Sequence, residues 1–242
     1  MKKGLLLVIG LVLAVSLLLV GCEAQETTSA NSSQQTGIWV SGTGEVTATP
    51  DVAILTLGVE AQETTVKAAQ SEASSAMNAV VDALKTNGVA DKDIQTQWYS
   101  ISPVTKWDDK TNEQITTGYS VTNMVTAKIR DITKAGTIID AVTDAGGNLT
   151  RINGISFTVN DPTAYNNQAR EKAMQDANAK AQQMATLAGI TLGKPIYISE
   201  TSSYIPQPYN LKVYADSGSA STPISAGELD ITLSVSVGYS IE

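Results

Sequence analysis

Few side chains in this chain could carry out chemistry. Among its 242 residues there is one cysteine, Cys22, and no histidine. Histidine catalysis, His-ligated metals, Cys-x-x-Cys redox chemistry and intramolecular disulfides are therefore excluded, because each needs residues that the chain lacks. The 24 acidic residues could supply a carboxylate pair, but no pattern in the sequence pairs them. We expect a protein that is not an enzyme and that has no cofactor and no metal.

Two short motifs fit a binding loop only in part. The run Ser41-Gly42-Thr43-Gly44-Glu45 begins like a phosphate loop, but Thr47 stands where a dinucleotide fingerprint needs glycine, and the context is a strand. Close backbone packing is the better interpretation of these glycines. Asp108, Lys110 and Asn112 suggest a calcium loop, but a lysine occupies a ligand position, which favours a solvated hairpin.

The only cysteine follows an export signal. Lys2 and Lys3 precede an apolar run over residues 5–20, which is typical of a signal peptide. The run Leu19-Val20-Gly21-Cys22 resembles a bacterial lipobox, in which the cysteine is lipidated and becomes the mature N-terminus. We therefore predict a signal peptide over 1–21, a lipidated Cys22 with a flexible tether over 22–37, and a folded domain over 38–242. The alternative is a free cysteine in a membrane helix.

The charge of the chain limits its partners. Loss of residues 1–21 removes two lysines and lowers the formal charge from −8 to −10. Arginine occurs only at positions 130, 151 and 170, and no basic cluster follows Lys3. Since phosphate backbones select such clusters, we expect no nucleic acid partner. The lipid alone is expected to hold the protein to a membrane.

Hydrophobic periodicity predicts an α+β fold. The helix pattern, with apolar residues three and four apart, covers 64–87, 131–145 and 163–188. The strand pattern covers 38–47, 51–60, 94–104, 115–129, 151–159, 195–200 and 229–241. Pro50-Asp51 separates the first two strands and is interpreted as the turn of a hairpin. Asn87-Gly88 supplies the stop signal of the first helix.

The last helix and the last strand have the clearest patterns. Helix 163–188 carries alanine at every fourth position from 169 to 185, either as a ridge that lets another element approach closely or because alanine favours helix. Strand 229–241 alternates aliphatic and polar residues, so one face is buried. The order helix, strand, strand occurs twice. We predict two such modules in one compact domain, with helices packed on a largely antiparallel sheet.

The stretch 199–227 is a long loop rich in Ser, Thr, Pro and Gly. It carries Tyr204, Tyr209 and Tyr214, and long loops with aromatic residues often contact a partner. The alternative is a loop that packs on its own domain. Both remain open from the sequence.

Four groups of residues follow one another along the chain in a specific order. They are Val40–Val46 with Thr49-Pro50-Asp51, Asp93-Ile94-Gln95-Thr96, Gly154-Ile155-Ser156-Phe157, and Pro223-Ile224 with Gly227-Glu228-Leu229. Together they resemble the SIMPL-domain family, which includes bacterial periplasmic immunogenic proteins and oxidative-stress-defence-type proteins. The resemblance spans nearly all of 38–242. It implies an exported α+β protein without established catalytic residues, some relatives of which form rings. The lipobox and tether depart from the soluble periplasmic members.

Two functions are compatible with this sequence. The first is a non-enzymatic, lipid-anchored cell-envelope protein that self-associates, into a ring by the resemblance, with a structural or stress-related role. It would be exported, anchored to a bacterial membrane, and face the periplasm or the cell exterior. The alternative is a ligand-binding lipoprotein that holds a small molecule or peptide between its modules, with Trp39, Trp98 or Trp107 as cleft aromatics.

Overall fold

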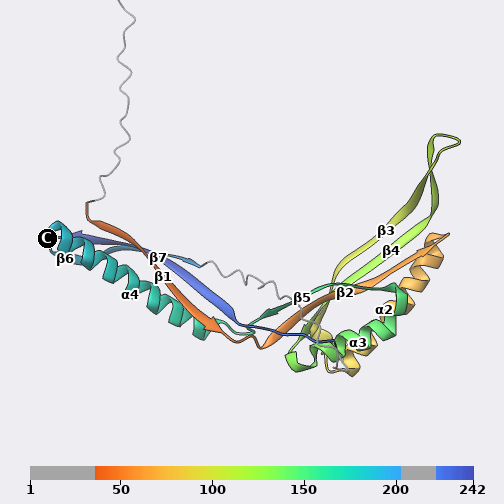
Figure 1. Ribbon diagram of the computed structural model, residues 1–242, viewed down its shortest axis with the longest axis horizontal. Coiled ribbons are helices and arrows are strands. Elements are labelled where there is room, and N and C mark those ends of the chain that lie inside the picture. The colour runs from red at the N-terminus through yellow and green to blue at the C-terminus, as the bar shows by residue number, and fades with distance from the viewer. Residues whose placement is uncertain (1–35, 203–221) are drawn as a thin grey trace, which may run out of the picture. The chain divides into compact units, whose positions relative to one another are not determined.

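The computed structural model describes residues 36–202 and 222–242, and the folded unit runs from Ile38 to Glu242. Its three α-helices are α2 (Val66–Thr86), α3 (Ala135–Gly146) and α4 (Thr163–Ala188). Its seven strands are β1 (Ile38–Ala48), β2 (Val52–Glu63), β3 (Ile94–Asp108), β4 (Glu113–Ile129), β5 (Thr150–Thr158), β6 (Leu192–Ser202) and β7 (Leu229–Ile241) (Figure 1). Within the described ranges, no helix is long and apolar enough to cross a membrane.

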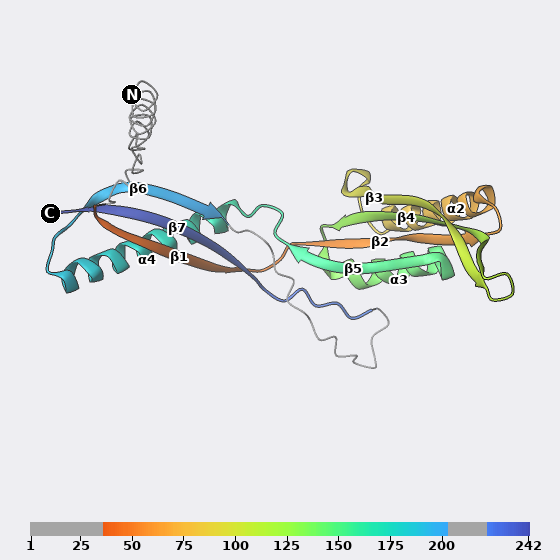
Figure 2. The same cartoon turned by 90° about the horizontal axis from the view of Figure 1, so that it is seen from above.

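The strands form two antiparallel sheets, and the predicted α+β class is confirmed. One sheet has the order β1-β7-β6 and the other β3-β4-β2-β5 (Figure 2). In both, a helix is followed by an antiparallel strand pair: α2 by β3 and β4, and α4 by β6 and β7. The repeated helix–strand–strand order is therefore present. Each pair is completed by an earlier strand, since β2 pairs with β4 and β1 pairs with β7.

The prediction of a hairpin around Pro50-Asp51 is wrong. Strand β1 pairs along its whole length with β7, and β2 lies between β4 and β5 in the other sheet. Residues 49–51 are a crossover between sheets. The backbone N–H of Asp51 donates to the Thr158 carbonyl oxygen (3.2 Å), and the Asp51 carboxylate accepts from the Asn160 N–H (2.7 Å). Proline and aspartate end a strand both at a hairpin turn and at a crossover to another sheet, so they do not distinguish the two. Which of the two forms depends on where the flanking strands are buried.

In the four-stranded sheet, β2 supplies the centre of the core. Its residues Leu55, Leu57, Val59 and Ala61 are fully buried beneath the helices. Helix α2 begins after Thr65, whose hydroxyl accepts from the Ala68 N–H (3.2 Å), as expected for an N-cap. Its buried stripe meets this face of the sheet and consists of Ala69, Ala73, Met77, Val80 and Leu84.

In the three-stranded sheet, α4 packs closely on β1. All five alanines of the ridge, at 169, 173, 177, 181 and 185, are buried. A Cβ added at Gly42 would lie 2.0 Å from the carbonyl oxygen of Ala173 and 2.7 Å from the Cβ of Ala177. One added at Gly44 would clash equally with the backbone at Ala169. The close-approach interpretation of both the alanines and the glycines is thus the correct one, because any larger residue would separate helix and strand.

Candidate interaction surfaces

Cys22, the predicted lipid site, lies outside the described residues, and its role stays a prediction. The predicted partner loop 199–227 lies partly outside them as well. Its beginning belongs to β6, and its end is held against α3, where the N–H of Thr222 donates to the Asp140 carboxylate (3.0 Å). Ile224 packs against the core of the four-stranded sheet. The described end of the loop is therefore attached to its own domain.

The three tryptophans do not gather around one cleft. Trp39 lies in β1 of the three-stranded sheet, whereas Trp98 and Trp107 both lie in β3 of the other sheet. A hollow of about 200 Å³ lies between the end of α2 and the start of α3, lined by residues that include Val89, Arg130 and Ile138. That is smaller than the ~300–1,000 Å³ of typical ligand pockets. A larger hollow of about 410 Å³ lies on α4, lined by residues that include Met174, Gln175 and Gln182, and none of the three tryptophans lines either hollow. In the described parts of the chain, no group of three acidic, Cys or His side chains could hold a metal ion.

The outer edge of β1 is covered by charged side chains of α4. Lys172 Nζ donates to the Glu45 carbonyl oxygen (2.7 Å), and Lys180 Nζ donates to that of Ser41 (3.0 Å). Between them, the Asp176 carboxylate accepts from the Thr43 N–H (2.8 Å). These bonds use backbone groups that an edge strand would otherwise offer to another chain.

Electrostatics reinforces this covered edge. Asp176 also accepts a hydrogen bond from Lys180 at 2.6 Å, and this bond, followed by the one from the Thr43 N–H, lowers the pKa of its carboxyl. Asp176 is therefore ionised at neutral pH, and Lys180 and Thr43 both donate to a carboxylate. The four-residue spacing of the three side chains is visible in the sequence, but its target, an edge strand from the other end of the chain, is not.

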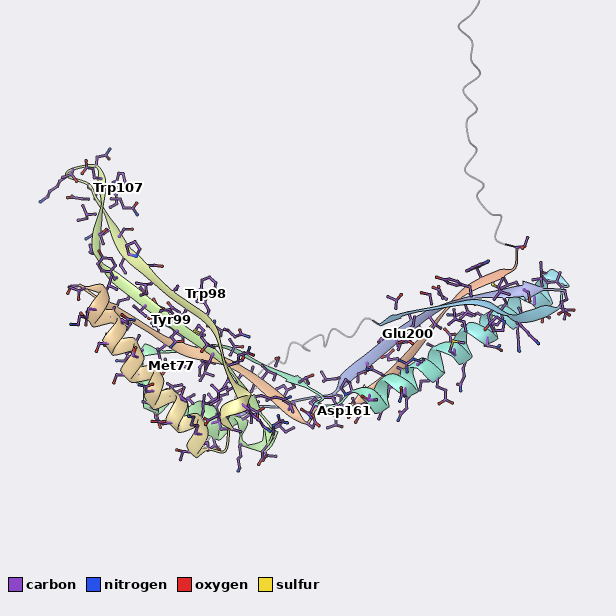
Figure 3. The ribbon with its side chains drawn as sticks, turned by 180° about the vertical axis from the view of Figure 1, so that it is seen from behind. Met77, Trp98, Tyr99, Trp107, Asp161 and Glu200 are labelled. Atoms are coloured by element: carbon purple, nitrogen blue, oxygen red, sulfur yellow. The ribbon has the colours of Figure 1, made fainter. Side chains whose placement is uncertain are left out.

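The edge strand β3 is not covered in this way and carries exposed apolar side chains. The exposed fractions are 63% for Trp98, 48% for Tyr99, 42% for Ile101 and 54% for Trp107. Figure 3 shows Trp98 projecting from the side of the sheet opposite α2, and Trp107 close to the end of the hairpin. Surface exposure of single apolar residues is ordinary, but four of them on one edge strand make β3 a candidate contact surface.

Beyond the sheet, β3 and β4 continue as a two-stranded arm over residues 104–117. The pairing of β2 with β4 ends at Glu63 and Tyr119, so no third strand from the described residues pairs with the arm (Figure 1). The turn of the arm is closed by Asp108, which accepts from the Lys110 N–H (2.9 Å), and by Asn112 at φ 56°. The solvated hairpin predicted here is confirmed. Two-stranded ribbons are marginally stable alone, and the exposed Trp107 and Ile115 leave apolar surface for a partner.

The edge strand β6 also carries exposed apolar side chains. Ile196 and Ile198 are 58% and 55% exposed, and we call them the β6 edge pair. Helix α4 reaches this strand through Arg170, whose guanidinium donates twice to the Glu200 carboxylate. The bidentate pair fixes the helix to β6 but leaves the two isoleucines outside the core. The sequence predicted only residues 195–200 of this strand and gave no indication of its edge position.

Comparison with known proteins agrees with the fold. The family model described as "SIMPL: Protein of unknown function (DUF541)" matches residues 38–239. The chain is 38% identical over 224 residues to the 26 kDa periplasmic immunogenic protein of Brucella melitensis biotype 1, covering 87% of each chain. It is 30% identical over 193 residues to the uncharacterized protein YggE of Escherichia coli K12, covering 79% of this chain and 75% of that protein.

A third relative, the uncharacterized protein YggE of Edwardsiella ictaluri, is 29% identical over 209 residues, covering 86% of this chain and 85% of that protein. The α+β architecture and these matches together define a SIMPL-type domain. The chain belongs to the SIMPL family, and the resemblance noted in the sequence is confirmed.

Proposed function

We propose that this chain is a non-enzymatic, lipid-anchored protein of the bacterial cell envelope that self-associates into a ring and has a structural or stress-related role. The observation that supports it is the contrast between its strand edges. The β1 edge is covered by Lys172, Asp176 and Lys180, whereas β3 and β6 carry exposed apolar side chains and have no such cover among the described residues. A protein that avoided association would cover all its edges.

The β3 and β6 edges belong to different sheets, so a contact between them would join copies head-to-tail. In our proposal, the β3–β4 arm of one copy, with Trp107 and Ile115, contacts the β6 edge pair of the next. Head-to-tail contacts form a ring when the rotation between copies closes, and an open filament when it does not. A partner strand would also give the two-stranded arm the third strand that it lacks.

Export and anchoring complete the proposal. The sequence 1–22 carries the signal peptide and lipobox pattern, and one relative is named a periplasmic protein. Lipidation of Cys22 would place the folded unit on the outer side of the membrane that the signal crosses. Mass spectrometry of the protein from bacterial membranes tests this step: we expect a mature N-terminus at Cys22 with a diacylglyceryl adduct, and an intact Met1 would contradict it.

Self-association is tested by multi-angle light scattering of the protein without residues 1–22. We expect one discrete species with a mass several times that of the monomer. Ile198→Lys and Ile115→Lys should each convert it to smaller species, because a lysine at either edge must be buried unpaired in the contact. Leu187→Lys is the matched control, since Leu187 is 81% exposed on α4 and outside both surfaces.

Two outcomes count against the proposal. One is a monomer at every concentration for the unsubstituted protein. The other is an oligomer that Leu187→Lys dissociates as much as the two edge substitutions do, which would place the contact on α4. A circular dichroism spectrum unchanged by each substitution shows that the fold is retained.

A further inference from the structure

The three-stranded sheet has a second face that α4 does not cover. Successive residues of a strand point to opposite faces of the sheet, and in β1 the positions of Gly42 and Gly44 face α4. The odd-numbered residues of β1, and the residues that pair with them, therefore point to the open face. Three cross-strand rows follow from the register, each read from β1 through β7 to β6: Trp39–Gly238–Tyr197, Ser41–Ser236–Ser199 and Thr43–Ser234–Thr201.

The first row is an aromatic pair built around a glycine. The rings of Trp39 and Tyr197 have centroids 5.3 Å apart at an interplanar angle of 43°. Gly238 makes this possible, since a Cβ there would lie 2.9 Å from the indole carbons of Trp39. Tyr197 is 48% exposed, and the indole N–H of Trp39 is buried without a hydrogen-bond partner among the described residues. An orphaned donor of this kind is uncommon and calls for an explanation.

The other two rows carry hydroxyl groups only. None of the six Ser and Thr hydroxyls makes a hydrogen bond within the described part of the chain, so each is free to donate and to accept. No charged side chain stands in the three rows. The next two rows of the same face do carry charge, since Glu45 pairs with Thr232 and Thr47 with Asp230, and both charges are acidic. The open face of the other sheet carries both signs: Glu60 and Arg151 form an ion pair there at 3.1 Å, and Lys128 lies on the same face.

The neutral patch is the size of a small ligand. Four residue steps along a strand span about 13 Å, and three strands span about 10 Å. The resulting ~130 Å² is far below the ~800 Å² per partner of a stable protein interface. A second copy is therefore a poor occupant of this face. The absence of charge in the rows makes nucleic acid and acidic polymers poor occupants as well.

We propose that this open face binds a neutral, linear oligosaccharide. A sugar ring has a face of C–H groups, which suits the Trp39–Tyr197 pair, and a rim of hydroxyls, which can exchange hydrogen bonds with the two hydroxyl rows. Because β7 is the central strand, the face stays open even when a strand edge is in contact with another copy. This inference does not depend on self-association.

Isothermal titration calorimetry of the full-length protein with an N-acetylglucosamine tetrasaccharide tests the inference. We expect saturable binding that Tyr197→Ala weakens roughly tenfold through loss of the aromatic contact. Tyr99→Ala is the matched control, since Tyr99 is also 48% exposed but lies in β3 of the other sheet. It should leave the affinity unchanged.

A second pair of variants removes single hydroxyls and keeps the aromatic pair intact. Ser236→Ala should weaken binding roughly fivefold, the effect of one lost hydrogen bond, whereas Ser102→Ala in β3 should not. Absence of saturable binding by the unsubstituted protein at millimolar sugar overturns the inference. So does equal weakening by the variants of both sheets. A change of oligomer size by Tyr197→Ala without any sugar binding would likewise overturn it and assign the face to a second copy.

Discussion

The close contact between α4 and β1 makes a sharp prediction for one alanine. Ala177 is fully buried, and its Cβ lies 2.7 Å from where a Cβ of residue 42 would be. In Ala177→Leu, three additional carbon atoms must enter a space bounded by the backbone of β1. Side chains can change rotamer to accommodate extra volume, but a strand paired along its whole length cannot move alone.

Overpacking of this kind costs about 3 kcal/mol, the upper part of the usual range, because the neighbour at Gly42 is backbone. That is a factor of roughly 150 in the unfolding equilibrium and a loss of about 6–12 °C in Tm for a domain of this size. Ala179→Leu is the control on the same helix, since Ala179 is exposed. It should change the free energy of unfolding by no more than about 0.5 kcal/mol.

The measurement is guanidinium denaturation of both variants, followed by far-UV circular dichroism. The reasoning is refuted if the two variants have free energies of unfolding within about 0.5 kcal/mol of each other. A further check is the m-value. It should stay the same in Ala177→Leu, because local overpacking does not change the surface exposed on unfolding.

The remaining predictions concern β7 and one acidic side chain. A chain that ends at Gly227 should fail to fold, since β7 is the central strand and its six buried side chains contribute roughly 10–20 kcal/mol of gross burial; a cooperative thermal transition in that chain would contradict this. The bidentate hydrogen bonds from Arg130 (both 2.8 Å) lower the pKa of Asp93, so its stabilisation is present above the ordinary carboxyl pKa and is lost as pH falls through the lowered value. Asp93→Asn should lower the denaturation midpoint at pH 7 and make the midpoint depend less on pH below about pH 4. Asp91→Asn is the control at an exposed position and should have neither effect. If both variants show the same acid sensitivity, Asp93 is not the group responsible.

Most element boundaries could be predicted because periodicity is local. Helix 163–188 and strand 229–241 coincide with α4 and β7, and helix 64–87 exceeds α2 by one or two residues at each end. In β7, the alternation of aliphatic and polar residues predicts which side chains are buried, although it does not show which element covers them. Only its last aliphatic, Ile241, is exposed at 45%, because the strand ends beyond the core.

The candidate surfaces were much less accessible to prediction. In the sequence, only residue type distinguishes the tryptophans and the single cysteine, and the structure places the tryptophans in two different sheets rather than around one cleft. The sequence predicts part of the arm over residues 104–117 as a loop, because Trp107-Asp108-Asp109 has a turn-like composition. The pairing of Trp39 with Tyr197 depends on the register of three strands that are far apart in the chain.

The sequence by itself determined the class of the fold, the position of nearly every helix and strand, and the scarcity of catalytic side chains. Only the tertiary structure decided which strands pair, which edges are covered and what the alanine ridge is for. The reason is that β1 and α4 have no local signal for each other. Their contact forms because Gly42 and Gly44 and the alanine ridge leave no side chain between them, a complementarity that exists only once both ends of the chain are brought together.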